Sequence, residues 1–257
     1  MLRLTEIRLP IHHSEEDLRR AILNRLAISP DDLLEYVLFR RNHDARKKRD
    51  IDFVYTVDVS VRNEQALLEK LPPHRHIKPA PDMRYRFVAH AHGTPPRPVI
   101  AGCGPCGLFA ALILAQSGFK PIILERGKMV RERARDTFTF WRQGDLDPES
   151  NVQFGEGGAG TFSDGKLHTQ IKDPGHYGRK VLTELVSAGA PPEILYLGKP
   201  HVGTFRLVKV VEQLRQTIQS LGGEFRFQSR VDKLDIADGR IRGIMTAHGE
   251  YVACGHL

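Results

Sequence analysis

The sequence predicts a mixed α/β protein, in which a small α+β unit precedes a larger domain around a parallel sheet. Three observations predict it. Apolar residues alternate with polar ones around residue 55, a strand–glycine turn–helix–strand succession follows residue 98, and seven of the sixteen prolines fall within residues 72–98. Because prolines cluster in linkers, we place a boundary there. Residues 1–94 then form the first unit with its linker, and residues 95–257 the second domain.

The first unit is expected to contain two helices and a hairpin. Ser14 opens a helix with Asp17 three positions later, a capping-box arrangement. Strict alternation from Phe53 to Val61 indicates a strand, which pairs with an earlier strand over residues 35–41. The apolar stripe of the helix comprises Leu18, Ile22 and Leu26; Asn63 caps a shorter helix ending near Leu71, and a further strand is expected over residues 84–91.

Composition excludes several classes of protein. With 40% apolar and 27% charged residues in 257 positions, the chain can bury a core, unlike disordered or collagen-like proteins. The longest apolar run, Leu108–Ala115, is far shorter than the roughly 18 residues of a membrane span. The N-terminus does not resemble a secretory signal, and three cysteines are too few for a disulfide framework. We therefore expect a cytoplasmic protein without a membrane span.

A modest positive charge leaves nucleic-acid binding as an alternative. Lysine and arginine (38) outnumber aspartate and glutamate (31), and the excess is spread along the chain. The basic run Arg46–Arg49 falls in the predicted hairpin connection, where a solvated loop explains it. Since no aromatic-rich pattern for RNA recognition accompanies this run, RNA binding by the first unit is the less favoured prediction.

The glycines after the first strand of the second domain are spaced for a dinucleotide. Gly102, Gly104 and Gly107 form a G-x-G-x-x-G pattern between an apolar strand at Val99–Ala101 and a buried helix. The first glycine permits a tight turn, the second lets a pyrophosphate approach the backbone, and the third lets the helix pack closely. Pro105 fits the first helical turn, because its missing N–H costs nothing there. The pattern predicts a Rossmann-like fold.

A carboxylate at the end of the next strand extends this prediction. Residues 120–124 form a second apolar strand, and Glu125 follows it, 23 positions after Gly102. An acidic side chain at that place accepts both hydroxyls of an adenosine ribose, and its charge repels a 2′-phosphate. Arg126 is a candidate for contact with the adenine or the phosphates, although an ordinary surface arginine explains it equally well.

A second glycine-rich segment lies about fifty positions beyond the first. Residues 155–165 contain five glycines, among them Gly157, Gly158 and Gly160, along which backbone amides can approach an extended ligand. Thr161 and Ser163 can donate hydrogen bonds to phosphate or ribitol oxygens. A domain that binds NAD alone rarely needs such a second segment. A flexible surface hairpin is the alternative.

At these motifs the sequence resembles a known family. The glycine doublet is similar to that of flavoproteins with two dinucleotide-binding domains, in which it lies near the FAD pyrophosphate. GEGGAGTFSDGKL (155–167) and GKPHVGT (198–204), after an N-terminal α+β domain, look like the uncharacterised FAD-dependent dehydrogenase family over the whole chain. The resemblance implies an FAD-dependent oxidoreductase of a small-molecule substrate, with NAD(P)H or another electron donor as partner. It supplies no catalytic acid or base.

The remaining elements complete the expected domain. Helices are predicted over residues 176–188 and 204–221, the first of them within a helical insertion over about residues 172–203. Residues 224–228 form the third strand of the sheet. A meander follows it, with a turn at Asp238-Gly239.

The resemblance also has implications for the end of the domain. In those flavoproteins, a residue just after the third strand contacts the adenine edge through its backbone; Val231 occupies that place, and an ordinary buried strand residue is the alternative. Full-length relatives continue into another sheet strand, which pairs beside the strand at Val99. Without that strand, the strand at Val99 has an unpaired edge. We therefore expect an N-terminal portion, or fragment, with weakened FAD affinity and an incomplete FAD-binding domain.

Other reactive side chains have no predicted role. Cys103 and Cys106 form a C-x-x-C pair in the pyrophosphate turn, at the adenine side of the cofactor and so away from a flavin ring, and four zinc ligands are not assembled near them. Lys166, His168 and His201 are candidates for a proton donor, but nothing in the sequence distinguishes one. A protein that binds the nucleotide without turnover is a third alternative.

Overall fold

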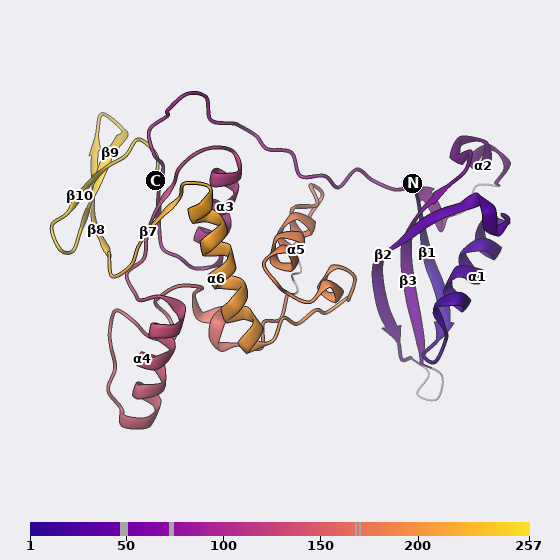
Figure 1. The fold of residues 1–257 in the computed structure, drawn as a ribbon, viewed down its shortest axis with the longest axis horizontal. Helices are drawn as coiled ribbons and strands as arrows, with labels where there is room; N and C mark the ends of the chain where they lie inside the picture. Colours follow the sequence, from indigo (N-terminus) through magenta and orange to yellow (C-terminus); the bar gives the residue numbers. More distant parts are fainter. Residues whose placement is uncertain (47–50, 72–74, 168, 170) are drawn as a thin grey trace. The chain divides into compact units, whose positions relative to one another are not determined.

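The chain forms two compact units, which the computed structural model describes for residues 1–257 except 47–50, 72–74, 168 and 170 (Figure 1). The first unit comprises Met1–Arg84, His168–Gly175 and Pro192–Pro200, and the remaining three segments form the second unit. Of the basic run, Lys47, Lys48 and Arg49 lie outside the described residues.

The first unit is an antiparallel sheet with strand order β2-β3-β1-β4 and two helices. The succession β-α-β-β-α-β with this strand order is the ferredoxin-like arrangement. Both predicted helices and the hairpin of β2 and β3 are confirmed. The elements are β1 (Leu2–Pro10), α1 (Glu15–Leu26), a 3₁₀ turn (Pro30–Asp32), β2 (Leu33–Asp44), β3 (Asp52–Val61), α2 (Glu64–Lys70) and β4 (Ile77–Pro79).

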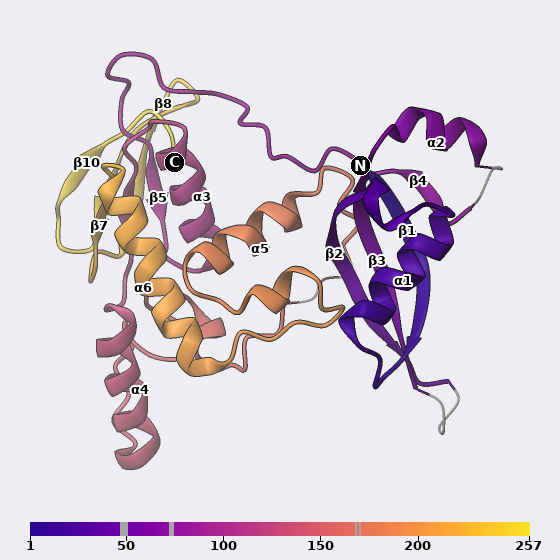
Figure 2. The same cartoon turned by 45° about the vertical axis from the view of Figure 1, so that its right-hand side comes forward.

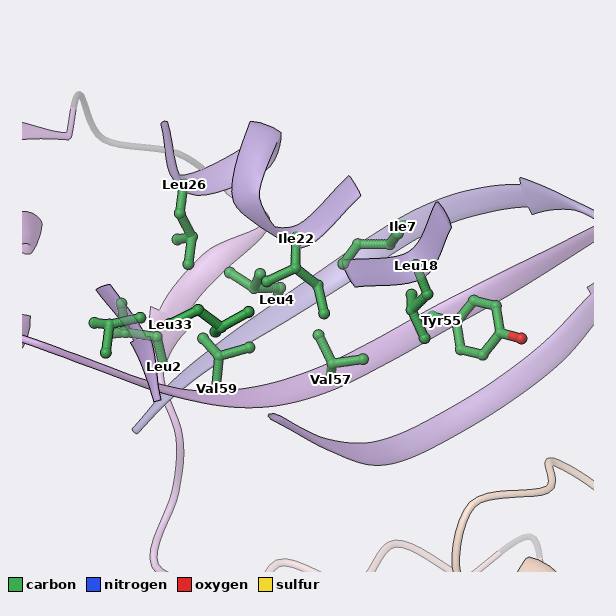
Figure 3. Close-up of a cluster of buried hydrophobic side chains, with 11 residues drawn as sticks. Leu2, Leu4, Ile7, Leu18, Ile22, Leu26, Leu33, Tyr55, Val57 and Val59 are labelled. Atoms are coloured by element: carbon green, nitrogen blue, oxygen red, sulfur yellow. The ribbon is translucent and has the colours of Figure 1, made fainter. Parts of the chain in front are cut away.

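Helix α1 forms because the sequence encodes both its start and its apolar stripe locally. The Ser14 hydroxyl accepts from the Asp17 N–H (3.2 Å), and the Asp17 carboxylate accepts from the Ser14 N–H (2.9 Å), which completes the capping box. Leu18, Ile22 and Leu26 are buried in the cluster between α1 and the sheet (Figure 3). Burial of each such side chain contributes about 1.5–3 kcal/mol, so the stripe fixes the helix on the sheet.

Two strands within the first 94 residues differ from the prediction. The sequence pattern does not predict β1, although β1 pairs with both β3 and β4, because its alternation breaks at Glu6, where φ is +57° at a register shift. The strand predicted over residues 84–91 is wrong, since no strand is assigned to this described segment. Its side chains alternate, but the Ala91 N–H donates to the Ser117 carbonyl oxygen (2.8 Å) rather than to a neighbouring strand.

The second unit contains a parallel sheet with strand order β5-β6-β7. Its strands are β5 (Val99–Ala101), β6 (Ile122–Leu124) and β7 (Glu224–Arg226). Helix α3 (Pro105–Gln116) connects β5 to β6, helix α6 (Thr204–Ser220) precedes β7, and the two helices pack against each other (Figure 1 and Figure 2). The predicted strand–helix–strand unit is confirmed, and the chain has a mixed α/β fold.

Further helices and a meander surround this sheet. Helix α5 (Tyr177–Ser187) and the antiparallel sheet β10-β9-β8 agree with the prediction. The sequence does not predict α4 (Val130–Gln143), because two of its three buried residues, Arg133 and Thr137, are polar. The other elements of this unit are a 3₁₀ turn (Ala159–Phe162), β8 (Val231–Ala237), β9 (Arg240–Thr246) and β10 (Tyr251–Ala253), and a further 3₁₀ turn (Pro192–Leu195) belongs to the first unit. Among the described residues, no helix combines the length and the apolar character needed to cross a bilayer.

Candidate functional site

A pocket of about 330 Å³ lies at the carboxyl ends of β5 and β6. This edge of a parallel sheet is where α/β folds bind their ligands. Half of the twelve residues predicted to hold a cofactor line the pocket: Gly102, Gly104, Glu125, Arg126, Gly158 and Val231. The fold therefore gathers both glycine-rich segments, the carboxylate and the start of the meander around one cavity.

The first glycine turn leaves its backbone open on the side of this pocket. Gly102 has φ +100°, which favours glycine, and a Cβ on Gly107 would lie 2.0 Å from the Gly102 carbonyl oxygen. A Cβ on Gly104 would meet nothing within 4 Å. Gly104 is the N-cap of α3, Pro105 is in its first turn, and no side chain of the described residues caps this helix. The three glycines thus serve a tight turn, an open backbone and close packing, in that order.

Glu125 joins three segments at the base of the pocket. Its buried carboxylate accepts from three backbone N–H groups: those of Cys103 (2.6 Å, Oε2), Gly127 (2.8 Å, Oε1) and Gly155 (3.0 Å, Oε1). A carboxylate has about four acceptor positions, so about one remains, on Oε2. Glu125 therefore keeps about one acceptor position for a further donor, fewer than the two hydroxyl contacts that the sequence predicts.

The second glycine-rich segment packs directly onto the first turn. The Gly157 N–H donates to the Cys103 carbonyl oxygen at 2.7 Å. Gly158 has φ +63°, and a Cβ there would lie 3.0 Å from Cδ of Pro105 and 3.3 Å from Cα of Gly104. The segment therefore needs glycine for close contact with the turn, and Gly158 forms a wall of the pocket.

The hydroxyl groups of this segment bond to its own backbone. The Thr161 hydroxyl donates to the Gly158 carbonyl oxygen (2.9 Å), and the Ser163 hydroxyl donates to the Gly160 carbonyl oxygen (2.7 Å). None of Gly160, Thr161 and Ser163 lines the pocket. Their bonds stabilise the turn that follows Gly158.

Arg133 of α4 organises the second segment, and the sequence gives no sign of it. Its side chain is fully buried and donates to four carbonyl oxygens and one hydroxyl at 2.6–3.0 Å. Burial lowers the pKa of Arg133 to about 10. Because hydrogen bonds to a charged group contribute about 1.5–3 kcal/mol each, this guanidinium holds the segment in shape. The acceptors are the carbonyl oxygens of Asn151, Val152, Glu156 and Gly158, and the Thr161 hydroxyl.

A buried ion pair connects the same segment to α6. Glu156 is fully buried, accepts from the Val130 N–H (2.8 Å), and has Oε1 2.9 Å from Nε of Arg215. The two groups attract as charges without a linear hydrogen bond. Burial raises the pKa of Glu156 above its usual value, and Val130 and Arg215 oppose this shift. Sequence spacing alone could not bring these residues together.

Two arginines form the charged side of the pocket. Nε of Arg126 donates to Oε2 of Glu149 (2.8 Å), and the Arg126 guanidinium lies 3.8 Å from the ring centroid of Phe154. Arg230 lies 3.5 Å from Oε1 of the same glutamate, which therefore pairs with both arginines. Arg126, Phe154 and Arg230 line the pocket. The sequence identified Arg126 as a candidate but gave no indication of Glu149 or Phe154.

The cysteines at the turn differ in exposure. Cys103 is buried, and burial raises the pKa of its thiol well above the usual value, with added repulsion from Glu156 and Glu125. Cys106 is exposed, and both thiols are free. A buried thiol with a raised pKa is a poor nucleophile, so Cys103 does not support a redox pair. In the part of the chain that the structure describes, no group of three acidic, histidine or cysteine side chains is placed to hold a metal ion.

Two of the proton-donor candidates lie beside one carboxylate. Nζ of Lys166 is 3.3 Å from Oδ2 of Asp164, and Nδ1 of His201 is 3.6 Å from the same oxygen. All three side chains are about half exposed, so these pairs are weak. His168 lies outside the described residues. The geometry does not single out a catalytic acid or base.

Comparisons with known proteins give one strong sequence match. The family model described as "Domain of unknown function (DUF8436)" matches residues 1–60. A Clostridium beijerinckii protein described as uncharacterized is 42% identical over 260 residues; the match covers all of this chain and 48% of that protein. The chain therefore spans about half the length of the curated relative that it matches.

Similarities to solved structures are weaker. The THI4 structure of Thermovibrio ammonificans has a TM-score of 0.38 at 16% identity, over 63% of this chain and 54% of that one. A 3-ketosteroid-Δ4-(5α)-dehydrogenase of Rhodococcus jostii has a TM-score of 0.40 at 16% identity (66% and 45%), and a glycine oxidase of Bacillus cereus has 0.32 at 15% (63% and 53%). Such TM-scores are too low to establish a shared fold, so function must be argued from the geometry of this chain.

Proposed function

We propose that the second unit is a partial, Rossmann-like FAD-binding domain, and that the complete protein is an FAD-dependent oxidoreductase of a small-molecule substrate. The supporting observation is that one pocket contains the open backbone at Gly104, the N-terminus of α3, which no described side chain caps, and the Glu125 carboxylate. A helix N-terminus stabilises an anion, and a carboxylate accepts from a hydroxyl. A pyrophosphate and a ribose therefore suit neighbouring parts of the pocket.

The size of the pocket defines which part of the cofactor it takes. About 330 Å³ is at the lower end of the roughly 300–1,000 Å³ of small-molecule sites, which suits one part of a dinucleotide rather than all of it. We assign this part to ADP. Arg126 and the backbone of Val231 then face the adenine, and the remaining acceptor position of Glu125 takes one ribose hydroxyl.

The residues of this chain bind and orient the cofactor in this proposal. Bound FAD supplies two-electron chemistry with the substrate, and NAD(P)H or another electron donor completes the cycle. Gly102 and Gly107 shape the turn, Gly157 and Gly158 hold the second segment against it, and Gly160, Thr161 and Ser163 keep that segment rigid.

Calorimetric titration of the 257-residue chain with ADP tests the proposal. We expect saturable binding that weakens at least tenfold, about 1.4 kcal/mol, in Gly104→Val, because the added side chain occupies the space over the turn. Gly255→Val is the matched control, since its Cβ also meets no atom within 4 Å but lies outside the pocket. Absence of ADP binding, or equal loss in both variants, would refute the assignment.

A further inference from the structure

The first unit has a groove of about 1,100 Å³, more than three times the volume of the proposed ADP pocket. It lies between the start of α1 and strands β2 and β3, and all its lining residues belong to the first unit. Tyr36, Phe53 and Tyr55 give it aromatic walls, and His13 and Arg41 give it polar ones. A groove of this size that combines aromatic walls with charged side chains suits a small organic ligand.

Arg41 lines this groove, and one of its buried side-chain nitrogens lacks a hydrogen bond among the described residues. Its guanidinium carbon lies 4.8 Å from the ring centroid of Phe53 and 5.4 Å from that of Tyr196. Its Nε is buried and has no hydrogen-bond partner among the described residues. A buried donor without an acceptor costs about 1–3 kcal/mol, which an anionic ligand would recover after a small movement of the side chain.

The neighbouring polar groups already have partners. Nδ1 of His13 donates to the Pro10 carbonyl oxygen (2.8 Å), so its Nε2 accepts from the Tyr55 hydroxyl (3.1 Å). The Phe53 ring lies 6.0 Å from that of Tyr55 and 5.8 Å from that of His13. This side of the groove therefore offers ring surfaces to a ligand, while Arg41 offers positive charge.

A separate part of the chain completes this site. The Arg41 N–H donates to the Tyr196 carbonyl oxygen (2.7 Å), and the Gly198 N–H donates to the Arg41 carbonyl oxygen (3.2 Å). A Cβ on Gly198 would lie 2.0 Å from Oδ1 of Asn42, so a larger residue there requires the Asn42 side chain to move. The first residue of the GKPHVGT motif thus places the Tyr196 ring at Arg41, a role in the first unit that nucleotide binding in the second unit does not explain.

We propose that this groove binds a small aromatic carboxylate, with its carboxylate at Arg41 and its ring against Phe53 and Tyr36. Arginine matches a carboxylate in geometry, because its planar fork of N–H groups suits two oxygens. The groove is also lined by Glu15, Glu16 and Glu35 against Arg19 and Arg41, so its surroundings disfavour a dianion such as phosphate about twice as much as a monoanion, and the direct contact with Arg41 selects the carboxylate. This assignment does not depend on the function proposed for the second unit.

Titration of the 257-residue chain with 3-phenylpropanoate, followed by NMR or calorimetry, tests it. We expect saturable binding that weakens at least tenfold in Arg41→Gln and remains unchanged in Arg40→Gln. Arg40 is the matched control, because it is the exposed neighbour on β2 and does not line the groove. Phenethylamine and inorganic phosphate should not compete.

A second variant and a second ligand keep the outcome decisive. Tyr196→Ala retains Arg41 but removes the ring that lies 5.4 Å from its guanidinium carbon, and we expect it to weaken 3-phenylpropanoate binding while the circular dichroism spectrum stays that of the wild type. ADP binding should be equal in the wild type and in Arg41→Gln, which separates this site from the one in the second unit. Absence of 3-phenylpropanoate binding, equal loss in Arg40→Gln, or competition by phosphate would overturn the proposal.

Discussion

Gly104 of the first turn and Gly155 of the second glycine-rich segment use glycine for different physical reasons. In the first turn, Gly104 faces open space, so the missing side chain gives access to the backbone. In the second segment, a Cβ on Gly155 would lie 2.3 Å from Cδ of Arg133, so the missing side chain allows close packing. A high density of glycine therefore identifies a site only when the structure distinguishes access from packing.

Among the substitutions that test this difference, removal of the Arg133 guanidinium is expected to lower the free energy of unfolding most. Arg133→Met leaves four carbonyl oxygens and one hydroxyl without their buried donor, and we expect it to lower the free energy of unfolding by about 3–5 kcal/mol. Urea denaturation measures this. Arg135→Met, at an exposed position of the same helix, should cost less than about 0.5 kcal/mol. Equal effects of the two substitutions would show that the second segment does not depend on Arg133.

Alanine substitutions at Gly155 and at Gly104 are expected to change the free energy of unfolding by less than Arg133→Met does. Gly155→Ala places a Cβ against Arg133 at φ +122°, and we expect a loss of about 1–3 kcal/mol in urea denaturation. Gly104→Ala should change stability by less than about 0.5 kcal/mol, because its extended backbone and open surroundings accept a methyl group. A similar loss in both variants would contradict the distinction between access and packing.

The pH dependence of stability gives the smallest expected effect. Burial raises the pKa of Glu156, so the stability that its protonated form contributes is complete below the unfolded pKa of about 4.3 and is lost as the pH rises through the folded value. Glutamine does not titrate. The free energy of unfolding of the wild type, minus that of Glu156→Gln, should therefore be larger at pH 4 than at pH 7.

Urea denaturation at several pH values measures this difference. Glu132→Gln, at an exposed position of α4, is the control. The free energy of unfolding of the wild type, minus that of Glu132→Gln, should not be larger at pH 4 than at pH 7. If the free energy of unfolding of the wild type, minus that of Glu156→Gln, instead grows as the pH rises, the ion pair with Arg215 outweighs the cost of burial.

Much of the fold could be predicted because many of its elements are determined by residues close together in the sequence. The capping box at Ser14, the strand–helix–strand unit after Val99 and the turn at Asp238-Gly239 each depend on neighbouring residues. Strand β1 could not be predicted from alternation, because Glu6 interrupts it, and α4 has polar side chains on its buried face. These elements are stabilised by partners distant in the sequence.

The candidate site divides in the same way. Spacing predicted Gly102, Gly104 and Glu125, which the fold brings to one pocket. Arg133 and Glu149 could not be predicted, because their roles arise only when α4 and the segment after it fold back on the glycine turns. Residues that shape a site through tertiary contacts have no local pattern of their own.

Hydrogen exchange with and without ADP tests the central claim most directly. The account predicts slower exchange in peptides that cover residues 102–107 and 153–158, with no change over residues 33–55 of the first unit. Exchange that is unchanged at both glycine-rich segments under saturating ADP, or slowed only in the first unit, would contradict it.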